Sequence, residues 1–256
     1  MTVEMKGQIE SLMKKKSDLR FEERSDGKEA ELYIYGPIGG FFFSDNSAQS
    51  IRRKLQDTKA ETIHVHINSG GGSAFDGVAI MNQLKNHKAE IIVHVDGLAA
   101  SAASVIAMAG DKVIMPENTM MMIHRASTIG FGNASEFEKL SNDLKKIDKS
   151  LAASYNDRFV GEQEELDQLL DDETWMTADE AVAFGLADEV TDEIEIQETE
   201  DLDEEDEEVS EPEGEYENVK DRLVAKYKSQ KNEKETEQTE PDEPVRQNLA
   251  GLFLHL

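Results

Sequence analysis

The chain has 256 residues, of which 38% are hydrophobic, and it carries a formal net charge of −28 with a pI near 4.5. This length favours one domain with an appendage, and the acidic balance argues against broad binding to nucleic acid or to an anionic membrane. The absence of cysteine excludes a disulfide framework, a thiol nucleophile and a cysteine zinc site.

The excess negative charge is concentrated in one segment. Residues 198–217 contain 13 acidic side chains and no basic one, whereas the residues before them have the composition of an ordinary globular domain. No apolar run approaches the roughly 18 residues that span a membrane, and the first residues lack the apolar core of a signal peptide. We therefore expect a cytoplasmic protein.

The first part of the chain alternates between strand and helix patterns. Residues 1–29 are polar and mixed in charge, which predicts a loosely held N-terminal arm. The residues after it predict a strand over 30–38, a helix over 47–57, a strand over 62–67, a glycine loop over 68–73 and a helix over 75–86.

The next stretch predicts a buried strand that delivers a serine to the start of a helix. Residues 91–95 form an apolar, β-branched run, Gly97 breaks it, and small residues then predict a helix that ends before Gly110. Ser101 lies at this junction, where unpaired N–H groups favour developing negative charge. From these residues alone, Ser101 is either a nucleophile or only the N-cap of a packing helix.

The second part of the core continues this alternation. The pattern predicts strands over 112–115 and 120–124, a long helix over 134–160 with one apolar face, a short helix over 162–170 and a closing segment over 186–190. Thr177 and Glu180 have the spacing of a capping box. Strands alternating with helices predict an α/β fold with right-handed crossovers.

The remaining residues read as an extension of this core. Residues 193–244 are highly charged and predict a disordered acidic linker, within which 218–228 has the pattern of a short helix. Residues 245–256 are apolar again, which is typical of a docking segment or of a frayed terminus.

A serine nucleophile needs a base, and His124 is the best candidate among six histidines. It ends the apolar run of 120–123, where a strand meets a loop, and open α/β folds place their sites at such ends. His64 and His66 share one face of a strand, but two ligands without a third do not make a metal site. The glycine loop has no Lys-Ser/Thr after it, so we expect an oxyanion hole, a substrate groove or a plain turn rather than a phosphate site.

Four motifs occur together in an order that resembles the Clp protease proteolytic subunit family. They are Ile67-Asn68-Ser69-Gly70-Gly71-Gly72, Gly97-Leu98-Ala99-Ala100-Ser101, Met122-Ile123-His124 and the segment from Thr177 to Asp188. The resemblance covers residues 30–192. The triple glycine, Asp172-Glu173-Thr174-Trp175 and the acidic C-terminal extension resemble more narrowly the phage head-maturation branch of that family.

The resemblance implies a serine peptidase without a cofactor, built as the spiral of ββα units shared by Clp proteases and crotonases. Ser101 matches the family nucleophile and His124 the general base, while the backbone N–H groups of Gly72 and Ala102 match the oxyanion hole. The helix over 134–160 matches the one that inserts between stacked rings, which implies a homo-oligomeric ring.

The third member of the triad departs from the family pattern, in which the acid is an aspartate. Aligning Trp175 and the three residues after it on the family turn puts Glu173 at the position of the acid. A glutamate can orient an imidazole, because only a carboxylate that accepts from the ring N–H is needed. Asp172 is the alternative, with Asp171 next to it. Gly70 also replaces the usual proline of the glycine loop.

These observations lead to one preferred function and three alternatives. We expect an ATP-independent serine endopeptidase that cleaves scaffold or capsid polypeptides in an assembling phage head, in the bacterial cytoplasm. The first alternative is a housekeeping Clp-like subunit fed by a ring ATPase. The others are a crotonase-type acyl-CoA enzyme, against which the Ser101 and His124 pairing argues, and a non-catalytic assembly factor.

Overall fold

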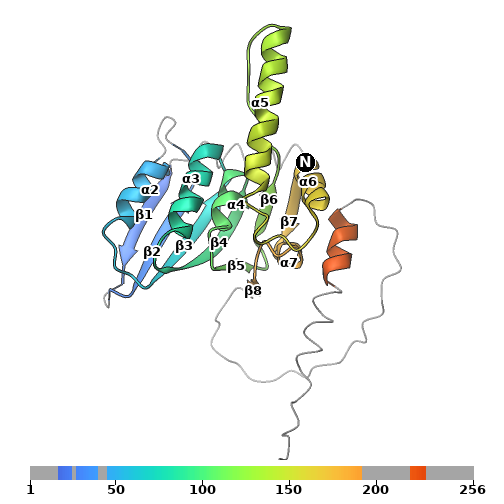
Figure 1. The fold of residues 1–256 in the computed structure, drawn as a ribbon. Helices are drawn as coiled ribbons and strands as arrows, with labels where there is room; N and C mark the ends of the chain where they lie inside the picture. Colours follow the sequence, from blue (N-terminus) through green and yellow to red (C-terminus); the bar gives the residue numbers. More distant parts are fainter. Residues whose placement is uncertain (1–16, 25–26, 40–44, 192–219, 229–256) are drawn as a thin grey trace, which may run out of the picture.

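The computed structural model describes residues 17–24, 27–39, 45–191 and 220–228 (Figure 1). In this part of the chain, eight strands form one sheet: β1 (Asp18–Glu23), β2 (Glu29–Tyr35), β3 (Thr62–Ser69), β4 (Glu90–Ala100), β5 (Lys112–Pro116), β6 (Met120–Ile123), β7 (Thr174–Thr177) and β8 (Glu189–Thr191). The labelled helices are α2 (Ala48–Leu55), α3 (Ala74–Lys85), α4 (Ala102–Ala107), α5 (Ala134–Ala152), α6 (Gln163–Asp171) and α7 (Ala178–Ala183).

The sheet is mixed, with the order β1-β2-β3-β4-β5-β8. All neighbours along this order are parallel except β1, which pairs antiparallel with β2. The early residues of β4 pair with β5, whereas Leu98–Ala100 pair with β6, and β6 then pairs antiparallel with β7. The α/β class expected from the sequence is therefore confirmed, and the split pairing of β4 lets β6 and β7 branch from the sheet beside its C-terminal end.

The core lies between the sheet and the helices that cover one of its faces (Figure 1). Buried and half-buried residues alternate along β2 and β3, as expected when only one face of a sheet is fully covered. Two predicted helix starts are confirmed by their caps, since Ser47 Oγ accepts the N–H of Ser50 and Ser73 Oγ accepts that of Asp76. The capping box of Thr177 and Glu180 is also present.

Three boundaries differ from the sequence prediction. Residues 18–23 of the expected N-terminal arm form β1, an edge strand whose charged side chains hide the strand pattern. Gly97 does not end β4, because the strand continues past it to reach β6. The long helix expected over 134–160 ends at Ala152, where the chain turns so that Tyr155 enters the core, 2% exposed.

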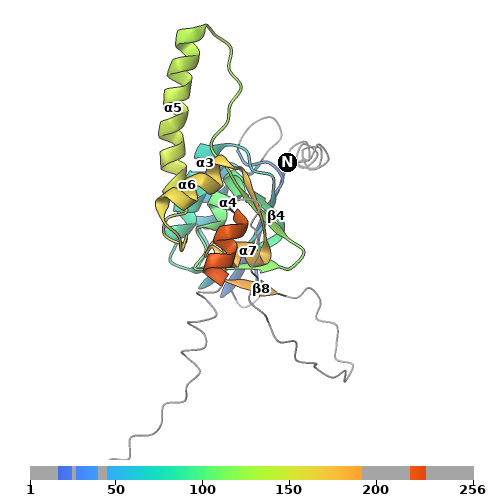
Figure 2. The same ribbon diagram turned by 90° about the vertical axis from the view of Figure 1, so that its right-hand side faces the viewer.

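The extension contributes one structured segment. Residues 220–228, inside the stretch expected to be a disordered linker, form a helix that packs beside α6 and α7 (Figures 1 and 2). Leu223 and Tyr227 are buried at 2% and 7% exposure, and Lys220 pairs with Glu180 over 2.9 Å. Packing of this apolar face stabilises a helix that would be marginal alone. The rest of 193–244 and the apolar segment 245–256 lie outside the described residues.

Candidate active site

Ser101 sits on a sharp turn between β4 and α4. Its backbone has φ 57° and ψ −123°, a conformation that costs an L-residue about 1–3 kcal/mol. The N–H of Ser101 donates to the carbonyl of Met122 over 2.9 Å, which ties the turn to β6. Ser101 is the N-cap residue of α4, but its hydroxyl makes no capping hydrogen bond. The junction found in the sequence is therefore a strained turn that leaves the hydroxyl free for another partner.

The buried hydroxyls of Ser104 and Tyr155 support this turn. Ser104 Oγ donates to the carbonyl of Ser101 over 2.7 Å and lies 2.9 Å from the hydroxyl of Tyr155. Ser104 is fully buried, and burial raises the pKa of Tyr155 to about 12, so the phenol stays protonated as a hydrogen-bonding group. In the sequence, Tyr155 is only one of several residues on the apolar face of the helix predicted over 134–160. Its polar role could not be seen without the turn.

His124 faces the Ser101 hydroxyl at the end of β6. Its Nε2 lies 2.7 Å from Ser101 Oγ, a hydrogen-bond distance suited to proton transfer. Burial lowers the pKa of His124 below its usual value, while the carboxylates of Glu173 and Asp148 act in the opposite direction. The imidazole is therefore kept neutral at pH 7, the state in which it can accept a proton.

The three consecutive acids of the sequence point in different directions. Asp171 pairs with Arg125 over 2.8 Å, and Asp172 accepts from the side chain of Gln168 over 3.1 Å. Both are exposed, whereas Glu173 is half-buried and its charge acts on His124. The structure thus brings Glu173, rather than Asp171 or Asp172, toward the imidazole.

Strand register and backbone conformation explain this placement of Glu173. In the antiparallel pairing of β6 with β7, Ile123 lies opposite Thr174. His124, which follows Ile123, therefore comes next to Glu173, which precedes Thr174. Glu173 has φ 51°, and it shares this positive φ with only one other non-glycine residue of the described chain, Ser101. Among the described residues, no hydrogen bond joins the side chains of Glu173 and His124.

The glycine loop packs directly against the Ser101 turn. Gly71 has φ 95°, and a Cβ there would lie 2.6 Å from Ser101 Cβ and 2.8 Å from the carbonyl of Ala100. The Ile38–Gly72 bridge uses the carbonyl of Gly71 and the N–H of Ser73, which leaves the N–H of Gly72 out of the pairing. The N–H of Ala102 belongs to the first turn of α4 and has no intrahelical partner. In the part of the chain that the structure describes, neither the N–H of Gly72 nor that of Ala102 is used by this bridge or by the helix.

A carboxylate from α5, which the sequence did not single out, contacts the loop after His124. Asp148 Oδ1 accepts the N–H of Ala126 over 2.7 Å, two residues after His124. In the sequence, Asp148 is one of several charged residues on a predicted amphipathic helix. Its only distinguishing signal is its place next to the apolar Ile147 near the buried end of that helix.

The other strand histidines form a separate cluster along β2, β3 and β4. His66 lies between Glu31 and Asp96 at 3.0 Å from each, and His64 Nδ1 lies 3.0 Å from His94 Nε2. Although burial opposes its charge, Asp96 and Glu31 raise the pKa of His66, whereas burial and its neighbours lower that of His94 to about 4. Within the described ranges, no group of three or more potential ligands is arranged to hold a metal ion.

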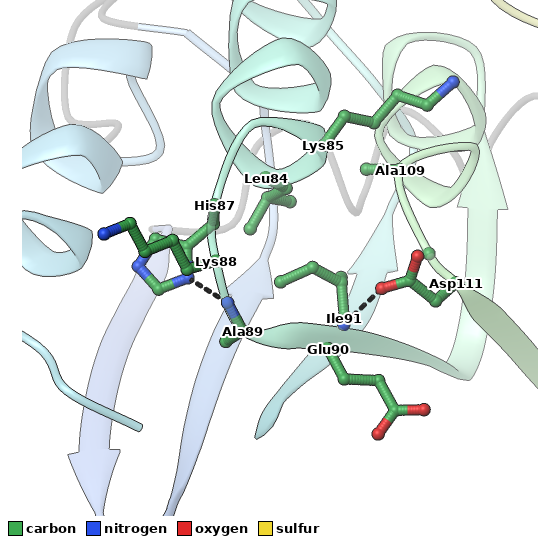
Figure 3. A pocket seen from close by; sticks show the side chains of 10 residues that line it. Leu84, Lys85, His87, Lys88, Ala89, Glu90, Ile91, Ala109 and Asp111 are labelled. Atoms are coloured by element: carbon green, nitrogen blue, oxygen red, sulfur yellow. Dashed lines mark hydrogen bonds between the residues drawn. The ribbon is translucent and has the colours of Figure 1, made fainter. Parts of the chain in front are cut away.

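A hollow of about 580 Å³ opens at the opposite end of β4 (Figure 3). Its polar groups serve local turns, since His87 Nδ1 accepts the N–H of Ala89 over 3.1 Å and Asp111 accepts that of Ile91 over 2.8 Å. Ser101 follows the other end of this strand, so the hollow is not part of the candidate active site.

Comparisons with known proteins match the part of the chain that carries this site. The family model described as Clp protease matches residues 28–194, which include every residue of the candidate site. The chain belongs to the Clp protease family. It is also 29% identical over 168 residues to the ATP-dependent Clp protease proteolytic subunit of Deinococcus radiodurans, covering 64% of this chain and 81% of the relative.

Membership of the Clp protease family fixes the broad class of the protein. The family consists of serine peptidases, whose proteolytic subunits form oligomeric rings and degrade polypeptides. The mixed α/β architecture described above is consistent with the fold of this family. No helix in the described part of the chain is long and apolar enough to cross a membrane.

Proposed function

We propose that the chain is a serine endopeptidase in which Ser101 is the nucleophile, His124 the general base and Glu173 the orienting acid. The observation that carries this proposal is the 2.7 Å contact between His124 Nε2 and the hydroxyl of Ser101, which is held on a strained turn. The positive φ values of Ser101 and Glu173 support two of these three residues, because strained backbone is concentrated at functional sites.

The geometry supports the usual two-step course of acyl transfer. Ser101 Oγ attacks the peptide carbonyl while its proton passes to His124 Nε2, and the N–H groups of Gly72 and Ala102 stabilise the oxyanion. His124 then gives the proton to the leaving amine, which breaks the peptide bond and leaves an acyl-enzyme. Water, deprotonated by His124, hydrolyses the ester and restores the Ser101 hydroxyl.

This proposal is tested by hydrolysis of unfolded polypeptides in the absence of ATP. Wild-type protein should release new amino termini, and Ser101→Ala should abolish this release. Ser127→Ala, in the exposed loop after His124, is the matched control and should cleave as wild type does. Equal cleavage by the wild type and Ser101→Ala would contradict the assignment of the nucleophile.

We further propose that the substrates are scaffold or capsid polypeptides in an assembling phage head. The support is the triple glycine at 70–72, the segment 172–175 and the acidic extension, all of which resemble the head-maturation branch of the family. The Deinococcus radiodurans relative is named as ATP-dependent, so a ring ATPase is the competing partner.

Two measurements separate these substrates and partners. A head-maturation protease should degrade a co-expressed scaffold protein without an ATPase, and removal of residues 193–256 should reduce its incorporation into proheads. Proteolysis that requires ATP and an added unfoldase would instead favour the housekeeping role. Unchanged incorporation of the truncated chain would show that the extension does not attach the protease to the prohead.

We also propose that α5 and the loop before it mediate assembly into a ring. This arm projects from the body (Figures 1 and 2) and carries Ile129, Phe131 and Phe137 at 88%, 97% and 48% exposure. Apolar side chains exposed together mark an interaction surface. Sedimentation should show an oligomer for the wild type and smaller species for the double variant Ile129→Ser, Phe131→Ser. A wild-type monomer at working concentration would refute this.

A further inference from the structure

The loop that follows His124 is held by a carboxylate from a distant part of the chain. Asp148 lies on α5, one turn before the buried Leu151, and accepts the N–H of Ala126 over 2.7 Å. Hydrogen bonds to an ionised acceptor are about twice as strong as neutral ones. Asp148 therefore fixes the backbone two residues beyond the imidazole.

The negative charge of Asp148 is not taken up by a nearby cation. Among the described residues, no lysine or arginine forms an ion pair with Asp148. Arg125, the cation adjacent to His124, instead pairs with Asp171 over 2.8 Å and with Asp167 over 3.1 Å. The charges that act on the imidazole are thus Glu173 from the start of β7 and Asp148 from α5, and both favour its protonated form.

The position of Glu173 leaves a role for this second carboxylate. Glu173 carries an extra methylene, and no hydrogen bond joins it to His124 in the described residues. An imidazolium in a half-buried site needs nearby negative charge, because desolvation disfavours its charged form. A second carboxylate on a rigid helix can provide part of that charge.

We propose that Asp148 is a second positioning residue for His124. It holds the backbone after the imidazole through Ala126, and together with Glu173 it stabilises the imidazolium formed when Ser101 gives up its proton. This inference rests on the proposed peptidase function for its catalytic consequence, but the coupling between Asp148 and His124 can be measured without activity.

Two substitutions separate the charge of Asp148 from its hydrogen bond. Asp148→Asn keeps an amide oxygen that can accept the N–H of Ala126 and removes only the negative charge. Asp148→Ala removes both. Asp143→Asn, on the same helix and paired only with Lys146 at the surface over 3.1 Å, is the matched control.

The primary measurement is the pKa of His124 by NMR titration of histidine-labelled protein, with His124→Ala to assign its signal. Asp148→Asn should lower the pKa of His124 by roughly half a unit, whereas Asp143→Asn should leave it at the wild-type value. In peptide hydrolysis, Asp148→Asn should reduce kcat several-fold with little change in KM. Asp148→Ala should reduce kcat by about 10- to 100-fold, because the loop is no longer held in place.

The possible outcomes separate this inference from the proposed function. A His124 pKa that is the same in Asp148→Asn and Asp143→Asn overturns the inference, even if activity falls. A lowered pKa together with reduced kcat supports it. A lowered pKa in a protein whose wild type cleaves nothing supports the coupling and overturns the peptidase function instead.

Discussion

Substitution of Gly71 by alanine tests whether the glycine loop sets the position of Ser101. The new Cβ would lie 2.6 Å from Ser101 Cβ, 2.8 Å from the carbonyl of Ala100 and 3.1 Å from the N–H nitrogen of Ala102. The first of these distances is roughly 1 Å short of ordinary van der Waals contact. None of these atoms can move by a simple side-chain rotation, so the turn that carries the nucleophile must shift.

Backbone strain and an overpacked contact both destabilise Gly71→Ala. An alanine at φ 95° costs about 1–2 kcal/mol of backbone strain, and the overpacked contact adds about 1–3 kcal/mol. Gly27→Ala is the matched control, because it has φ 67° but no atom within 4 Å of the new Cβ, so it carries the strain without the contact. We therefore expect Gly71→Ala to lower the free energy of unfolding by about 2 kcal/mol more than Gly27→Ala.

The effect on the candidate active site should be larger than the effect on stability. Because a displacement near 1 Å can cost about 100-fold in rate, Gly71→Ala should react with a fluorophosphonate about 100-fold more slowly than the wild type. Gly27→Ala should react at the wild-type rate. Chemical denaturation and labelling kinetics on the same samples measure both quantities. Wild-type labelling by Gly71→Ala, with stability equal to that of Gly27→Ala, would refute the role assigned to the loop.

Three further predictions concern the acid, the base and the C-terminal helix. Glu173→Gly should raise the free energy of unfolding by about 1 kcal/mol, because glycine accepts φ 51° without strain, while peptide hydrolysis falls; a loss of stability in denaturation would contradict this. Because burial holds the pKa of His124 below 6.5, kcat/KM should rise with pH through that lowered value and be level at pH 7; an acid limb centred above 6.5 would argue against His124 as the base. Leu223→Ala should weaken docking of the helix 220–228 by about 2 kcal/mol, seen as roughly 30-fold faster hydrogen exchange there, with the exposed Arg222→Ala as control; unchanged exchange would mean that Leu223 does not hold the helix.

The sequence predicted the elements whose signals are local. Apolar runs located the buried strands, and helical apolar spacing located α2 and α3 to within one or two residues, because these patterns depend on neighbouring residues alone. The edge strand β1 escaped prediction since its pairing with β2, rather than its own composition, makes it a strand. The predicted end of α5 was wrong for a similar reason, because burial of Tyr155 in the core overrides the helical periodicity.

In the candidate active site, too, some residues have a local sequence signal and others depend on the fold. Ser101 and His124 could be proposed from motifs that end a strand, and the structure places them 2.7 Å apart. The resemblance to the family turn favoured Glu173 over Asp172, but the position of Glu173 beside His124 depends on the pairing of β6 with β7 and on one positive φ, which the local sequence does not specify. Asp148 could not be found, because a contact between residues 126 and 148 depends on how α5 returns to the body.

The assignment of Ser101 as nucleophile is tested most directly by mapping a fluorophosphonate adduct with mass spectrometry. The expected result is a single adduct on the peptide that contains Ser101, formed rapidly by wild-type protein and at least 100-fold more slowly by His124→Ala. An adduct on another residue, or labelling that does not depend on His124, would contradict the proposed mechanism.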